Sequence, residues 1–166
     1  MRLGGEGDVA VDVRVVAASN RDLDEAVAQG LFRRDLFHRL AVFPIVLPAL
    51  AERREDIPAL ALHLLARAGA RHRIAPPPLR PAAMAALTLA SWPGNVRELA
   101  NLLERVVILA GGAVVGVTEL GLDPATCRAA LSGEDARRLA LRLAGNESEE
   151  LARFLGLDRD ELARRR

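Results

Sequence analysis

The residues with the clearest chemical implication lie in the stretch SWPGNVRELANLLERV, at positions 91–106. Asn95 followed by Glu98 has the spacing of a capping box, which predicts that a helix begins here. Arg97 then falls in the first turn, where the partial positive charge of the helix N-terminus disfavours a cation by up to about 1 kcal/mol. An arginine in this place favours an anionic ligand at the helix start. The competing interpretation is a solvated arginine.

Two more candidate arginines lie in the stretch GLFRRDLFHRL, at positions 30–40. Its apolar residues recur at every fourth position, which predicts a helix. Arg33 and Arg39 are six residues apart, so about 120° separates them on an ideal helix. Both can therefore reach one ligand only if the helix begins late or bends. Asp35 precedes Arg39 by four residues, a spacing that favours a surface ion pair instead.

Composition excludes several kinds of chemistry. The chain has 166 residues, 51% of them hydrophobic, a net charge of +1 and 23 basic residues, all arginine. Without lysine, neither a phosphate-binding loop of the usual kind nor Schiff-base chemistry is available from these residues. Cys127 is the lone cysteine and no apolar run approaches a membrane span, which predicts a cytoplasmic protein without membrane contact. The three histidines lack metal-ligand spacing, so no metal site is predicted.

Hydrophobic periodicity predicts an α/β segment followed by helices. Strands are expected near residues 9–18 and 42–47, with short helices between them. Further helices are expected from Asp56, over 81–89 and 95–109, and three times in the tail after residue 133. The fold class predicted is therefore α/β with two strands, then an all-α bundle, then a small helix-turn-helix.

Four stretches carry a family resemblance, in the order VDVRVVAASNRDL, GLFRRDLFHRL, FPIVLPALAERREDIPALALHLL and WPGNVRELANLLERVVIL. Together they resemble the second half of the sigma-54-dependent transcriptional activators, which are AAA+ ATPases also called bacterial enhancer-binding proteins. The tail LAGNESEELARFLGLDRDELARR resembles the Fis-type helix-turn-helix of that family. The resemblance implies a partial AAA+ core over 1–55, a helical lid over 56–112, a linker over 113–133 and the helix-turn-helix over 134–166.

The resemblance also implies roles for individual residues around ATP. Ser19 and Asn20 fall on sensor I, which reports on the γ-phosphate, although Asn20 alone would be interpreted as a turn residue. Arg33 and Arg39 fall on the arginine fingers, which reach the ATP of a neighbouring subunit. Arg97 falls on sensor II in the lid, which agrees with an anion at the helix start. The intact family assembles rings, uses ATP with Mg²⁺ and remodels the sigma-54 RNA polymerase holoenzyme.

The tail is expected to bind enhancer DNA weakly, although its shape is that of a DNA-binding module. Arg159, Arg164 and Arg165 are the candidate contacts with DNA. Residues 134–166 contain eight acidic residues and eight arginines, so their net charge is zero. Such a balance attracts phosphates poorly.

Three family motifs are absent from the printed sequence: the phosphate-binding loop, the Walker B acidic pair and the GAFTGA loop. Their order in the family places them before residue 1, which predicts that the sequence starts inside the domain. The chain alone is therefore expected not to hydrolyse ATP. Two other interpretations stay open: a non-catalytic module that docks on a homologue's ring or on DNA, and an inactive remnant.

Overall fold

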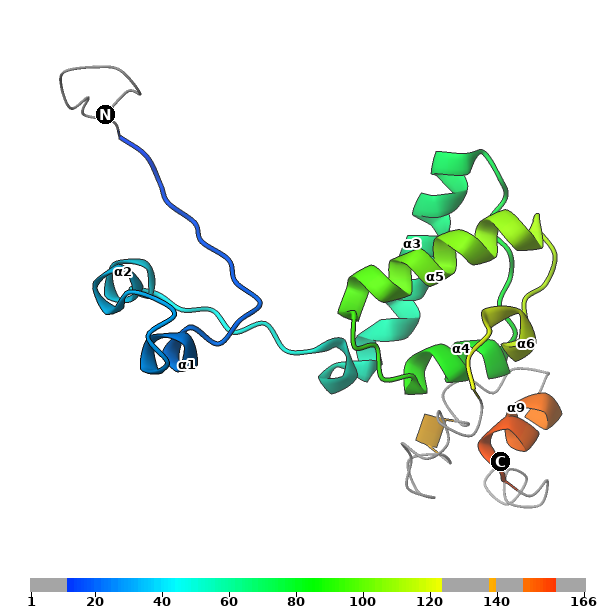
Figure 1. The fold of residues 1–166 in the computed structure, drawn as a ribbon. Helices are drawn as coiled ribbons and strands as arrows, with labels where there is room; N and C mark the ends of the chain where they lie inside the picture. Colours follow the sequence, from blue (N-terminus) through cyan, green and yellow to red (C-terminus); the bar gives the residue numbers. More distant parts are fainter. Residues whose placement is uncertain (1–11, 124–137, 140–147, 158–166) are drawn as a thin grey trace. The chain divides into compact units, whose positions relative to one another are not determined.

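The computed structural model describes residues 12–123, 138–139 and 148–157 (Figure 1). The chain forms two compact units, Met1–Leu47 and Pro48–Arg166.

The first unit is built around two short helices, α1 (Leu23–Ala28) and α2 (Arg34–Leu40), which contact each other. Asp22 caps α1 by accepting a hydrogen bond from the Glu25 backbone N–H at 3.1 Å. Gly30, with φ +72°, then turns the chain, and the loop folds back onto the C-terminal end of α1 through backbone hydrogen bonds. None of the helical residues of α1 or α2 is buried.

The two predicted strands are wrong for the residues that the structure describes. Residues 12–18 and 42–47 form no strand there, and the one β-pairing in the described ranges is an isolated bridge between Leu79 and Val115. A strand needs a neighbour to pair its backbone N–H and C=O groups, and no described segment lies in that place. The apolar side chains stay exposed as a result: Val16 is 82% exposed and Val46 is 89% exposed.

The second unit is helical, as the sequence predicts from Asp56 onward. Two 3₁₀ turns come first, η1 (Leu50–Glu52) and η2 (Arg54–Asp56). The α-helices that follow are α3 (Ile57–His72), α4 (Pro81–Leu89), α5 (Asn95–Ala110) and α6 (Val117–Leu120), and the tail contributes α9 (Ser148–Leu155). Prolines open two of these helices, Pro58 near the start of α3 and Pro81 at the start of α4. Gly111 ends α5 in the left-handed conformation, with φ +54°.

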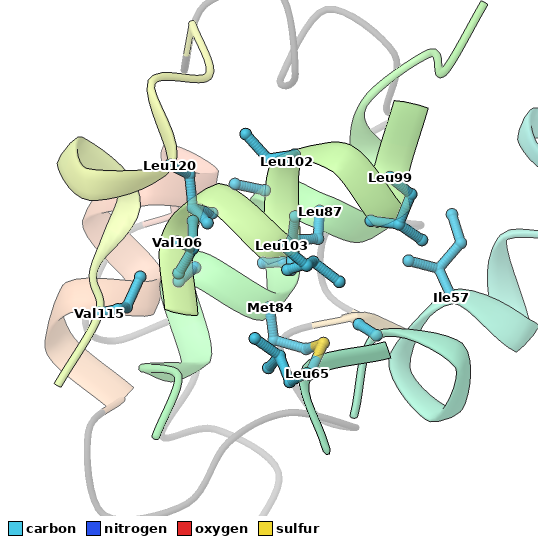
Figure 2. Close-up of a cluster of buried hydrophobic side chains, with 14 of the residues drawn as sticks. Ile57, Leu65, Met84, Leu87, Leu99, Leu102, Leu103, Val106, Val115 and Leu120 are labelled. Carbon is cyan, nitrogen blue, oxygen red and sulfur yellow. The ribbon is translucent and has the colours of Figure 1, made fainter. Parts of the chain in front are cut away.

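The core of this unit surrounds α4. Every residue from Ala82 to Leu89 is buried, so α4 is covered on all sides. Figure 2 shows Leu87 of α4 beside Leu103 of α5, with Val115 and Leu120 from the following segment completing the cluster. Part of the predicted linker thus belongs to the core.

The tail helix α9 also contributes to this core. Leu151, Phe154 and Leu155 are buried in the same cluster, and α9 contacts α4. The apolar face of α9 therefore stabilises the helical bundle.

Candidate functional site

Arg97 occupies the position that its sequence neighbourhood predicts. The helix α5 begins at Asn95, so Arg97 is the third residue and lies in the first turn. Its side chain is exposed and forms no hydrogen bond or ion pair with another described residue. Glu98 supplies a carboxylate to the positive end of the helix dipole, but it forms no ion pair with Arg97. The Arg97 guanidinium is therefore available to an anionic ligand.

The turn before Arg97 is anchored on the core by Trp92. This side chain is 3% exposed, and its indole Nε1–H donates to the backbone oxygen of Leu87 in α4 at 2.8 Å. The Trp92 backbone is left-handed, with φ +49°, and its oxygen accepts from the Asn95 N–H at 2.8 Å. The first turn of α5 is thus held to the buried helix α4.

The predicted capping box is half correct. Gly94, not Asn95, is the N-cap of α5, and the Glu98 carboxylate accepts from the Gly94 N–H at 2.8 Å. The Asn95 side chain does not cap the helix. Its Oδ1 accepts from the backbone N–H of Leu50 at 2.7 Å, a partner 45 residues away that no local sequence pattern indicates.

The two candidate fingers differ in their surroundings. Because α2 begins at Arg34, Arg33 lies before the helix with an extended backbone. Its Nε–H donates to Asp35 Oδ1 at 3.1 Å and its Nη2–H to Asp35 Oδ2 at 2.7 Å. This bidentate contact with Arg33 lowers the pKa of the Asp35 carboxyl below its usual 3.8.

Arg39, in the last turn of α2, is exposed and has no ion-pair partner within the described ranges. The predicted pair between Asp35 and Arg39 is therefore wrong, since Asp35 pairs with Arg33 instead.

Ser19 and Asn20 lie immediately before α1. The Ser19 hydroxyl accepts from the Arg21 N–H at 3.0 Å and donates to the Arg21 backbone oxygen at 3.2 Å, which forms a local turn. The exposed side chain of Asn20 forms no hydrogen bond with the other described residues. These two residues and the candidate fingers belong to the first unit, whereas Arg97 belongs to the second.

One cluster of charged residues was missed by the sequence analysis. Glu104 of α5 accepts from Arg71 Nη1 at 3.0 Å and lies 2.7 Å from His72 Nε2, both at the end of α3. The hydrogen bond with His72, and then that with Arg71, lowers the pKa of Glu104 below its usual 4.5. The cluster joins α3 to α5.

The remaining predicted residues give no further site. Arg159, Arg164 and Arg165 lie outside the described residues, as does Cys127. Among the residues that the structure describes, no group of three or more His, Cys, Asp or Glu side chains could hold a metal ion. In the same ranges, no helix has the length and apolar character needed to cross a bilayer.

Two family models match the chain in succession. Residues 1–46 match the sigma-54 interaction domain, and residues 51–136 match the AAA+ ATPase lid domain. The second match contains α3 to α6, and therefore Arg97 and most of the core around α4.

Curated relatives extend over the same region. The transcriptional regulatory protein ZraR of Salmonella typhimurium is 42% identical over 97% of this chain and 39% of its own length. The regulatory protein AtoC of Escherichia coli is 46% identical over 69% of this chain and 25% of its own length. The chain thus spans two fifths or less of these relatives.

Solved structures show the same fold. NtrX from Brucella abortus in complex with ADP is 34% identical, with a TM-score of 0.67 over 98% of this chain and 42% of that protein. Its complex with ATP is 33% identical with the same TM-score, over 97% and 42%. The chain therefore belongs to the AAA+ ATPase lid domain family, and its first 46 residues match the sigma-54 interaction domain.

Proposed function

We propose that this chain works in an ATP-dependent regulator that remodels the sigma-54 RNA polymerase holoenzyme, and that its lid binds the nucleotide through Arg97. The observation that carries the proposal is the exposed guanidinium of Arg97 at the positive end of α5, with no partner among the described residues. A guanidinium also matches phosphate geometry. The complexes of NtrX with ADP and ATP support a nucleotide as the anion.

The first unit supplies the other residues of the proposed site. Ser19 and Asn20 act as sensor I and respond to the γ-phosphate. Arg33 and Arg39 act in trans on the ATP of a neighbouring subunit in a ring of identical chains. Arg39 is available for this role because it has no partner in the described part of the chain, whereas Arg33 must exchange Asp35 for phosphate. Mg²⁺ accompanies ATP, and none of these residues is its ligand.

The remaining assignments follow the family. The AAA+ core spans 1–55, the lid 56–112 together with the buried segment that ends at Leu120, the rest of the predicted linker runs to residue 133, and a Fis-type helix-turn-helix spans 134–166, in a cytoplasmic protein. Arg159, Arg164 and Arg165 contact enhancer DNA. Because the charges of the tail cancel, its affinity for duplex DNA lies near the non-specific range of about 10⁻⁴–10⁻⁶ M at physiological salt.

Titration of the 166-residue chain with a fluorescent ATP analogue tests the role of Arg97. We expect Arg97→Ala to weaken binding by about tenfold or more, because a hydrogen bond to a charged group contributes about 1.5–3 kcal/mol. Arg105→Ala is the matched control, since Arg105 is another exposed arginine of α5. Equal affinities of Arg97→Ala and the unmodified chain would refute the proposal, as would equal losses in the two variants.

A second candidate function is a non-catalytic module that binds an intact homologue. In such a complex the homologue would supply the phosphate-binding lysine, because these 166 residues contain none. This candidate predicts that the chain joins a homologue's ring without changing its rate of ATP hydrolysis.

A further inference from the structure

The side chain of Asn95, at the start of α5, forms a hydrogen bond with a residue 45 positions away in the second unit. Its backbone has φ +51°, in the left-handed region where asparagine is among the few non-glycine residues that occur regularly. Glycine would meet this backbone requirement equally well. The carboxamide therefore serves another purpose, which is its hydrogen bond with the Leu50 N–H at 2.7 Å.

Leu50 is the first buried residue after the boundary between the two units, which lies at Leu47 and Pro48. It begins the turn η1, so its N–H has no acceptor within that turn. The Asn95 oxygen satisfies this donor, while the Leu50 side chain is only 2% exposed. The segment that enters the lid is therefore fixed both by side-chain burial and by a hydrogen bond to α5.

Arg97 follows Asn95 by two residues, in the same helical turn. Any movement of that turn relative to Leu50 must break or stretch the Asn95 hydrogen bond. We infer that Asn95 is a positioning residue, which couples a phosphate bound by Arg97 to the segment Pro48–Leu50. The inference rests on the proposed function for the role of Arg97, whereas the link between Asn95 and Leu50 does not depend on a nucleotide.

Amide hydrogen exchange at Leu50, measured by NMR on the 166-residue chain, tests the link. Asn95→Gly keeps the left-handed backbone but removes the acceptor, so the Leu50 amide should exchange about tenfold faster. Asn95→Asp keeps an acceptor oxygen and tolerates the same backbone, so protection should return close to its original level. Asn101→Gly is the matched control, because Asn101 is an exposed residue of α5 without a hydrogen bond to Leu50.

Binding of the fluorescent ATP analogue tests the coupling. Asn95→Gly should weaken binding several-fold when Arg97 is present and leave it unchanged in an Arg97→Ala background. A side chain that served only the stability of the lid would weaken binding equally in both backgrounds.

The two measurements separate the ways in which the inference can fail. Unchanged exchange at Leu50 in Asn95→Gly, or an equal increase in Asn101→Gly, would overturn the link between Asn95 and Leu50. Faster exchange with no loss of binding would overturn the coupling to Arg97. If the unmodified chain does not bind the analogue, the proposed function and the coupling both fail, and the exchange at Leu50 still decides whether Asn95 holds that segment.

Discussion

The two units support their candidate residues in different ways. In the first unit, α1 and α2 have no buried residue, and Val16, Phe43 and Val46 are each more than four-fifths exposed. In the second unit, Ile57 and Leu103 are fully buried. The bundle therefore fixes Arg97 through its own core, whereas the extended apolar segments of the first unit need partners from outside the described residues. Among the residues that the structure describes, only the lid carries the packing that specifies its site.

The largest expected effect concerns Arg33 and Arg39, the candidate arginine fingers of the first unit. Added to a homologue with a working phosphate-binding loop but mutated arginine fingers, the chain should restore ATP hydrolysis, while the chain alone shows none. An arginine acting in trans contributes about 10³–10⁵ in rate in related phosphoryl transfer. Arg39→Ala should abolish the rescue. Arg33→Ala should reduce it less, because Arg33 is paired with Asp35.

Co-purification of the labelled chain with the ring is the control for this assay. A chain that enters the ring without restoring hydrolysis would refute the finger assignment and favour the non-catalytic module. A rescue that survives Arg39→Ala and is lost with Arg33→Ala would reverse the roles of the two arginines.

One apolar substitution in each unit measures the difference in packing directly. We expect Leu103→Ala in α5 to lower the free energy of unfolding by about 2–5 kcal/mol, because it leaves a cavity in a close-packed core. Val46→Ala, at a side chain 89% exposed, should change it by no more than about 0.5 kcal/mol. Urea denaturation gives both values, with Trp92 fluorescence following the lid and far-ultraviolet circular dichroism following the helices of both units. Similar losses for the two variants would mean that the first unit is packed as tightly as the lid.

The smallest expected effect is on the stability of the lid at acid pH. Because its contacts with His72 and Arg71 lower the pKa of Glu104, folding favours the charged carboxylate. The resulting stabilisation is complete above the usual pKa of 4.5 and is lost as the pH falls through the lower value in the folded chain. Glu104→Gln should flatten the decline of the lid's melting temperature below about pH 5, as followed by circular dichroism.

In the first unit, the carboxyl of Asp35 also has a lowered pKa, so it can be compared with Glu104 of the lid. Its pair with Arg33 is local and exposed, so Asp35→Asn should leave the acid denaturation of the lid unchanged. An equal effect of Asp35→Asn and Glu104→Gln would show that the lid's acid response does not arise at the contact between α3 and α5.

The success of the sequence analysis also differs between the two units. The starts of α3, α4 and α5 were predictable because proline, glycine and helical apolar spacing act over a few residues. The strands near 9–18 and 42–47 were predicted from equally local patterns, but a strand depends on a neighbour that local patterns do not supply. In the first unit the short helices were therefore predicted correctly, whereas the described parts of the two strands were not.

At the candidate site, the same distinction between local and distant partners applies. Arg97 was placed correctly in the first turn of α5 because its position depends on the adjacent helix start. The bond between Asn95 and Leu50 spans 45 residues, and the pairing of Glu104 with Arg71 spans 33. No periodic pattern encodes such contacts, which arise only when helices pack.

The contact between Arg97 and a nucleotide can be observed directly through the guanidinium Nε–H signals of the ¹⁵N-labelled chain in NMR. On titration with a non-hydrolysable ATP analogue, the Arg97 signal should shift progressively and saturate, while the signal of Arg105 on the same helix stays in place. A shift of the same size at both arginines, or an unmoved Arg97 signal while others saturate, would contradict binding of the nucleotide by Arg97.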